Sequence, residues 1–218
     1  MTAKLIKLFS FELKRKLFNK TNWVSNCLFL LINVAIFPFT INPTKEILHQ
    51  LFLSVIMTSI ILVTVLINNN SFDEDTQDGS FDQYKIFGVS ESTIYLSKVI
   101  VASIEFALII SITLPFFSIF YQIEPEVIFK IWTSILLSAP LILSISIFGS
   151  FLTKNLSKNT SISILLSFPL LISSLINLSL SAEKIFNGYD NHFTYTGINV
   201  GLSLVIIPML YWLSKFLK

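Results

Sequence analysis

Residues 131–152 read IWTSILLSAPLILSISIFGSFL and contain no charged side chain. A helix needs about 20 predominantly apolar residues to cross the hydrocarbon core of a bilayer, so this segment predicts a membrane span. Five further segments have the same character. The six predicted spans cover approximately residues 23–41, 48–67, 94–121, 131–152, 162–180 and 198–216. The sequence therefore predicts an all-α, polytopic membrane protein in which residues 1–218 form a single transmembrane domain.

The composition agrees with a membrane class and excludes several kinds of site. Of the 218 residues, 53% are hydrophobic and 13% are charged, whereas a soluble domain carries about 25% charged residues. Cys27 is the only cysteine, which excludes an intrachain disulfide and a CxxC metal or haem-attachment motif. No G-x-x-x-x-G-K motif occurs, so the chain has no ATP-hydrolysing site of its own. We expect no metal site and no nucleic-acid partner.

The distribution of lysine and arginine predicts the orientation, because these residues accumulate in cytoplasmic loops. If the N-terminus is inside, only three of the 15 basic residues, Lys45, Lys130 and Lys184, lie on the outer side. The other twelve lie on the inner side: Lys4, Lys7, Lys14, Arg15, Lys16, Lys20, Lys85, Lys98, Lys154, Lys158, Lys215 and Lys218. We therefore predict that both termini are cytoplasmic.

The predicted spans also contain many small hydroxyl residues. Examples are Ser111, Thr113, Ser144, Ser146, Ser150, Ser173 and Ser174. Such residues either let membrane helices pack closely or line a substrate path. We favour packing, because interior prolines accompany the hydroxyl residues and leave backbone carbonyls for them to satisfy.

A basic amphipathic segment, KLIKLFSFELKRKLFNK, precedes the first span at residues 4–20. Leu5, Phe9, Leu13 and Leu17 recur at i+4 spacing, which is typical of one face of a helix. Lys7, Lys14 and Arg15 lie off this face. The segment predicts an interfacial helix whose lysines meet anionic lipid headgroups. It either anchors the first span or also contacts a cytoplasmic partner.

The loop at residues 68–93 is acidic although it is predicted to lie on the cytoplasmic side. Its acids are Asp73, Glu74, Asp75, Asp78, Asp82 and Glu91. A calcium-binding EF-hand is excluded, because counting from Asp73 the sixth residue is Asp78 rather than glycine. The D-x-x-D-G start of a membrane phosphatidyltransferase is present, but the Ala-Arg pair and the later aspartates of that motif are missing.

A docking surface is the interpretation of this loop that fits best. We expect Gly79 and Ser80 to form a turn and a helix N-cap, and an acidic first turn stabilises a helix. We expect a short coupling helix over residues 81–87 that presents Phe81, Tyr84 and Ile86 to a partner.

The sequence of this loop resembles a known family. FDEDTQDGSFDQ at residues 72–83 is similar to the loop of the haem exporter protein B (CcmB) family, an ABC-2-like permease of System I cytochrome c maturation. Lys98 matches the lysine that opens the third span in that family, and the basic start at Phe9 and the Phe37-Pro38-Phe39 end of the first span match as well. This chain has Phe-Asp-Gln-Tyr at residues 81–84 where the family usually has Leu-Glu-Gln-Leu.

The resemblance implies a non-catalytic membrane subunit that couples a cytoplasmic ATPase to the helix bundle. The implied partners are a CcmA-like ABC ATPase, CcmC-like and CcmD-like membrane proteins and a CcmE-like haem chaperone, with haem handled by the complex and ATP by the ATPase. The implied membrane is the bacterial inner membrane, or the mitochondrial inner membrane for an organelle-encoded chain. The residues of the implied ATPase-coupling loop are Asp73, Asp75, Gln77, Asp78, Gly79, Ser80 and Gln83.

Two alternative functions are open at this point. A related ABC-2-type permease would export another substrate, such as a lipid or drug. An intramembrane enzyme would use Glu105, an ionisable residue inside the third predicted span, together with the loop acids. His49 and His192 lie near the outer face, and isolated histidines of this kind are not assigned as haem ligands.

Overall fold

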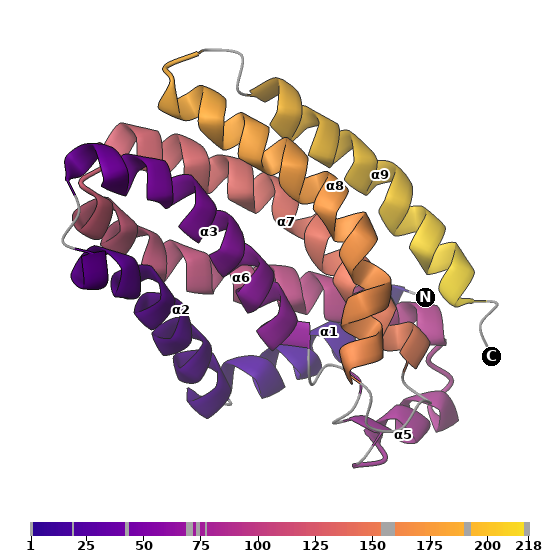
Figure 1. Cartoon of the computed structure of the whole chain (residues 1–218). Helices are drawn as coiled ribbons and strands as arrows, with labels where there is room; N and C mark the ends of the chain where they lie inside the picture. The colour runs from indigo at the N-terminus through magenta and orange to yellow at the C-terminus, as the bar shows by residue number, and fades with distance from the viewer. Residues whose placement is uncertain are drawn as a thin grey trace.

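The computed structural model describes residues 2–18, 20–41, 44–68, 72, 75–76, 78–153, 160–189 and 193–215. All regular secondary structure in these residues is helical, which confirms the all-α prediction (Figure 1). The helices are α1 (Thr2–Phe18), α2 (Lys20–Ile41), α3 (Lys45–Asn68), α5 (Ser80–Ile86), α6 (Glu91–Tyr121), α7 (Pro125–Thr153), α8 (Thr160–Phe186) and α9 (Phe193–Ser214).

Four of the described helices contain segments long and apolar enough to cross a membrane. These segments are Ile47–Asn68, Glu91–Tyr121, Pro125–Thr153 and Phe193–Ser214. In α2 the described apolar run is Trp23–Phe39, and the predicted span at 162–180 falls within α8. The chain is therefore a multi-pass membrane protein.

The ends of α6 illustrate how local sequence delimits a long membrane helix. The Oγ atom of Ser90 accepts a hydrogen bond from the backbone N–H of Thr93 at 3.3 Å, which satisfies one of the free amides of the first turn. At the other end Gln122 adopts a left-handed conformation with φ 52°, and Pro125 begins α7 soon afterwards. These signals place α6 and α7 side by side as an antiparallel pair.

The core lies around α6 and α7. In the most apolar stretch of α7, 67% of the residues are buried. The corresponding share in α9, which lies at the edge of the bundle, is 22% (Figure 1). The buried hydroxyl groups of Tyr95 and Tyr121 each donate to a backbone carbonyl of another helix, that of Ser144 at 3.0 Å and that of Val34 at 3.1 Å. These two buried hydroxyl groups are thus paired, which offsets the cost of their desolvation.

Polar side chains also join α7, α8 and α9, between the middle of the bundle and the end that lies away from α5. Asn199 donates to the Oγ of Ser138 and to the backbone carbonyl of Ser174, each at 3.0 Å. Thr196 contacts the hydroxyl groups of Ser181 at 2.9 Å and Ser134 at 3.2 Å. This polar seam supports the packing interpretation of the hydroxyl residues.

Two short elements occupy the opposite end of the bundle. The helix α1 runs across the bundle, and α5 projects beyond it (Figure 1). The start of α1 and the end of α9 lie at this same end (Figure 1). The amphipathic segment and the acidic loop, separated in sequence by two long helices, are thereby brought together.

Candidate functional site

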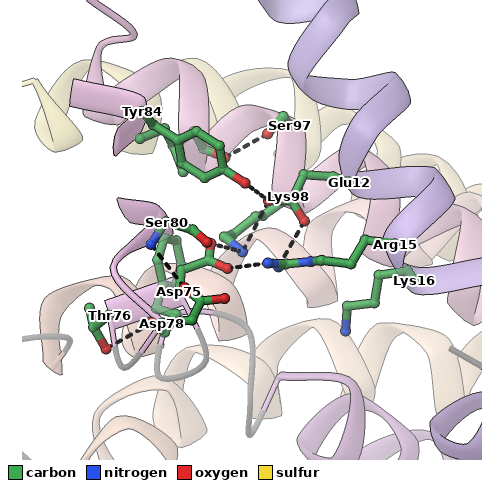
Figure 2. A network of polar contacts seen from close by, with 12 residues as sticks. Glu12, Arg15, Lys16, Asp75, Thr76, Asp78, Ser80, Tyr84, Ser97 and Lys98 are labelled. Carbon is green, nitrogen blue, oxygen red and sulfur yellow. Dashed lines mark hydrogen bonds and ion pairs between the residues drawn. The ribbon is translucent and has the colours of Figure 1, made fainter. Parts of the chain in front are cut away.

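The loop residue Asp75 is buried between two cations that come from different helices. Its side chain is fully buried, with Oδ1 2.6 Å from Nη1 of Arg15 in α1 and Oδ2 2.7 Å from Nζ of Lys98 in α6 (Figure 2). Charge-assisted pairs this short are strong when water is excluded. A single carboxylate therefore joins the loop to both helices.

A second carboxylate, that of Glu12 in α1, extends this arrangement. Its Oε2 atom accepts from Nη2 of Arg15 at 3.1 Å, and its Oε1 atom accepts from the hydroxyl group of Tyr84 in α5 at 3.2 Å (Figure 2). Nζ of Lys98 lies 3.7 Å from the same Oε1 atom. We call Glu12, Arg15, Asp75, Tyr84 and Lys98 the buried charge cluster.

The buried charge cluster is balanced, with two carboxylates against two cations. Burial alone would lower the pKa of Arg15, but the carboxylates of Glu12 and Asp75 raise it above its usual value. The pKa of the Tyr84 phenol is raised by burial and by the same two carboxylates, so this group stays protonated and donates to Glu12. Removing one partner of a buried ion pair leaves an uncompensated charge, which costs about 3–5 kcal/mol.

Aromatic rings hold the loop against the bundle beneath this cluster. The ring of Phe72 is buried, with its centroid 5.5 Å from that of Phe151 in α7 and 6.3 Å from that of Phe81 in α5. Nζ of Lys98 lies 5.1 Å from the centroid of the Phe72 ring, within range of a cation–π contact. Apolar packing and ionic contacts thus converge on the same loop.

The start of α5 is set by Asp78 and Gly79. Gly79 has φ 74°, a left-handed conformation that glycine adopts without strain, and Oδ1 of Asp78 accepts from the backbone N–H of Ser80 at 2.9 Å. The pKa of Asp78 is lowered by its hydrogen bonds with the side chain and the backbone N–H of Ser80. The expected helix at 81–87 is observed at Ser80–Ile86, and the expected turn precedes it. The N-cap is Gly79, without a side-chain hydrogen bond, rather than Ser80.

The residues that α5 exposes differ from those predicted. Phe81 packs into the bundle and Tyr84 points to Glu12, so the prediction that both would face a partner is wrong. Ile86 is exposed as predicted, at 82%, and Phe87, which the prediction did not select, is 74% exposed. The apolar surface of α5 is therefore its C-terminal pair, because the first turn is used for internal packing.

The structure brings together part of the predicted coupling loop. Asp75 is in the buried charge cluster, Asp78 to Ser80 form the turn before α5, and Gln83 is exposed on α5. Asp73 and Gln77 lie outside the described residues. The guanidinium group of Arg15, which the sequence places off the apolar face of the segment, contacts Glu12 and Asp75.

Sequence reasoning did not select Glu12 as a site residue. It is the only acidic residue in the basic segment at residues 4–20, which is the signal that could have identified it. It is also 1% exposed, which is unusual for glutamate unless the carboxylate is paired.

The other predicted ionisable residues lie apart from the buried charge cluster. Oε2 of Glu105 in α6 lies 3.4 Å from Nζ of Lys16 in α1, so this glutamate contacts the amphipathic helix. His49 lies in α3 with its Nε2 3.4 Å from the backbone carbonyl of Gln122, and His192 is outside the described residues. Within the described part of the chain, no three histidine, cysteine or acidic side chains gather as metal ligands would.

Comparison with known proteins gives a consistent result across most of the chain. The family described as CcmB protein matches residues 3–211. A protein named heme exporter protein B from Pseudomonas aeruginosa is 25% identical over 197 residues, covering 89% of this chain and 88% of that protein. A protein of the same name from Rhodobacter capsulatus is 26% identical over 148 residues, covering 68% of each chain.

Proposed function

The chain belongs to the CcmB family, and from that premise we propose that it is the membrane permease subunit of an ATP-driven, haem-exporting complex of cytochrome c maturation. The name heme exporter protein B, carried by relatives that align over most or much of this chain, supports this proposal. The subunit itself is non-catalytic, and a separate CcmA-like chain hydrolyses ATP. Haem delivery and release of the haem-loaded chaperone are the work of the whole complex.

One structural relationship carries the coupling part of the proposal. Ile86, the last residue of α5, and the C-cap residue Phe87 are exposed at the end of the bundle. The other side of α5 is tied to α1 through the hydrogen bond from Tyr84 to Glu12 (Figure 2). Exposed apolar residues beside a polar rim are typical of a protein-binding surface. The ATPase binds at this apolar pair, and its movement is transmitted through the buried charge cluster.

The proposed topology follows from this assignment. Six spans with both termini in the cytoplasm place α1, α5 and the end of α9 on the side of the ATPase. The excess of lysine and arginine on that side supports the orientation, as does the location of these elements at one end of the bundle (Figure 1). The membrane is the bacterial inner membrane, or the mitochondrial inner membrane for an organelle-encoded chain.

ATP hydrolysis then acts as a population shift between two packings of the bundle. A ligand or partner shifts such an equilibrium only by its difference in affinity for the two states. ATP-dependent closure of the ATPase supplies that difference at α5. The change in packing then acts on the CcmC-like, CcmD-like and CcmE-like proteins, within the membrane and at its outer face.

Substitution of the apolar pair tests the proposal. The double variant Ile86→Asp and Phe87→Asp should insert in the membrane but lose co-purification with the ATPase and cytochrome c maturation. Tyr189→Asp is the matched control, because Tyr189 is an exposed aromatic residue beyond α8 at the opposite end of the bundle. Normal ATPase binding by the double variant, or equal losses in the control, would contradict docking at α5.

A further inference from the structure

We infer that α1 and the α5-proximal part of α6 move as one rigid unit, whose register is held by the pairs Glu12–Lys98 and Lys16–Glu105. This inference rests on the proposed function and deepens it, because it assigns positioning roles to two residues outside the predicted loop, Lys16 and Glu105. In this arrangement Glu105 holds the amphipathic helix in place and takes no part in catalysis or transport.

The order of charges on the two helices is reciprocal. Along α1 the acid Glu12 precedes the base Lys16, and along α6 the base Lys98 precedes the acid Glu105. Nζ of Lys98 lies 3.7 Å from Glu12, and Nζ of Lys16 lies 3.4 Å from Glu105. The two residues are four positions apart along α1 and seven positions apart along α6, and both spacings place the residues on one face of a helix.

This pattern opposes sliding in either direction. A shift of α1 toward the C-terminal end of α6 would bring Glu12 against Glu105, and the opposite shift would bring Lys16 against Lys98. Each movement breaks two attractive contacts and creates a repulsive one. Like charges placed together in a poorly solvated contact strongly disfavour the wrong register.

Burial makes the pairs effective. The side chains of Glu12, Lys98 and Glu105 are almost completely buried, and that of Lys16 is 24% exposed. The apolar Leu8, one turn before Glu12, is buried as well. A helix that only anchors the chain in lipid would expose its charges to headgroups, whereas here a partly charged face of α1 packs on α6.

The consequence concerns how movement reaches the bundle. The buried charge cluster connects α5 to α1 through Tyr84 and Glu12, and the loop to α6 through Asp75 and Lys98. If α1 and α6 form one unit, displacement of α5 tilts both helices together. Further along α6, Pro115 lacks the N–H that would close a helical hydrogen bond, which provides a place for the helix to bend beyond the unit.

Chemical crosslinking tests this inference. In a Cys27→Ala background, the pair Lys16→Cys and Glu105→Cys removes one ionic contact and allows it to be replaced by a bifunctional thiol reagent. We expect the unlinked protein to mature less cytochrome c per ATP hydrolysed than the Cys27→Ala parent, and the crosslinked protein to recover the parental ratio. Recovery distinguishes a rigid unit from a contact that must open during each cycle. Full coupling without the crosslink, or coupling that stays low or falls after crosslinking, would overturn the inference.

Two further measurements keep the result interpretable. The charge-swapped double variant, Lys16→Glu with Glu105→Lys, should restore the coupling that is lost in Lys16→Glu alone. The rate of amide hydrogen exchange in α1 should rise in the single variant and return to the parental rate in the double variant. A hydrogen-exchange rate that stays high in the double variant would also count against the ion pair. Co-purification of the ATPase with the Cys27→Ala parent is measured first. If the ATPase does not co-purify, the proposed function is refuted. If it does co-purify but crosslinking does not restore coupling, only the rigid unit is refuted.

Discussion

Nζ of Lys98 lies 2.7 Å from Oδ2 of Asp75, so the first turns of α6 are ionically bonded to the loop that precedes them (Figure 2). The acidic residues of this loop therefore also have a role within the chain itself. The buried carboxylate of Asp75 neutralises cations of its own chain, and the surface that we propose for a partner is the exposed apolar pair Ile86 and Phe87.

Asp75→Asn should destabilise this end of the protein more than any exposed acidic substitution. The change leaves Arg15 and Lys98 near each other without their shared carboxylate, and the cost of such a buried uncompensated charge is about 3–5 kcal/mol. Thermal unfolding in detergent should occur at a lower temperature, and hydrogen exchange in α5 should rise. Asp82→Asn, an exposed position on α5, is the control and should unfold as the wild type does.

The helices could be predicted from sequence because the bilayer leaves few alternatives for a long apolar segment. The short helix α5 could be predicted as well, since Gly79 and Ser80 carry a local turn signal. The orientation of α1 could not be predicted in the same way. Its apolar spacing favoured a face of leucine and phenylalanine, but Arg15 is turned inward by Asp75, a residue distant in sequence with no local signal that pairs the two.

Tyr84→Phe tests the link between α5 and α1 alone. The substitution removes the hydroxyl group that donates to Glu12 at 3.2 Å and leaves the ring in place. A hydrogen bond to a charged group contributes about 1.5–3 kcal/mol, so the variant should be measurably less stable. A double-mutant cycle with Glu12→Gln measures the coupling energy between the two side chains. Additive effects in that cycle would show that the contact contributes nothing of its own.

Gly79→Ala should change the loop by strain rather than by a clash. No heavy atom lies within 4 Å of the position a Cβ would occupy, but φ 74° disfavours any residue with a side chain, at a cost of about 1–2 kcal/mol. We expect normal membrane insertion with reduced coupling of ATP hydrolysis to cytochrome c maturation. Gly201→Ala is the matched control, because that glycine lies inside α9 with equal free space and alanine favours the helix. Undiminished coupling in Gly79→Ala would argue against a precise role for the turn.

Asn199→Leu should loosen α9 without disturbing the buried charge cluster at the other end of the bundle. The amide nitrogen of Asn199 donates to Ser138 and to the carbonyl of Ser174, and its oxygen accepts from Asn177 at 3.1 Å. Interhelical hydrogen bonds in membranes contribute about 0.6 kcal/mol each on average. Since α9 buries the smallest share of its surface among the four described helices able to span a membrane, the loss of these bonds should raise hydrogen exchange in α9 most. Leu204→Ala, at an exposed position of the same helix, is the control. Equal hydrogen exchange in the two variants would mean that lipid and apolar packing hold α9 in place. The polar seam between α7, α8 and α9 would then fix only the rotation of α9.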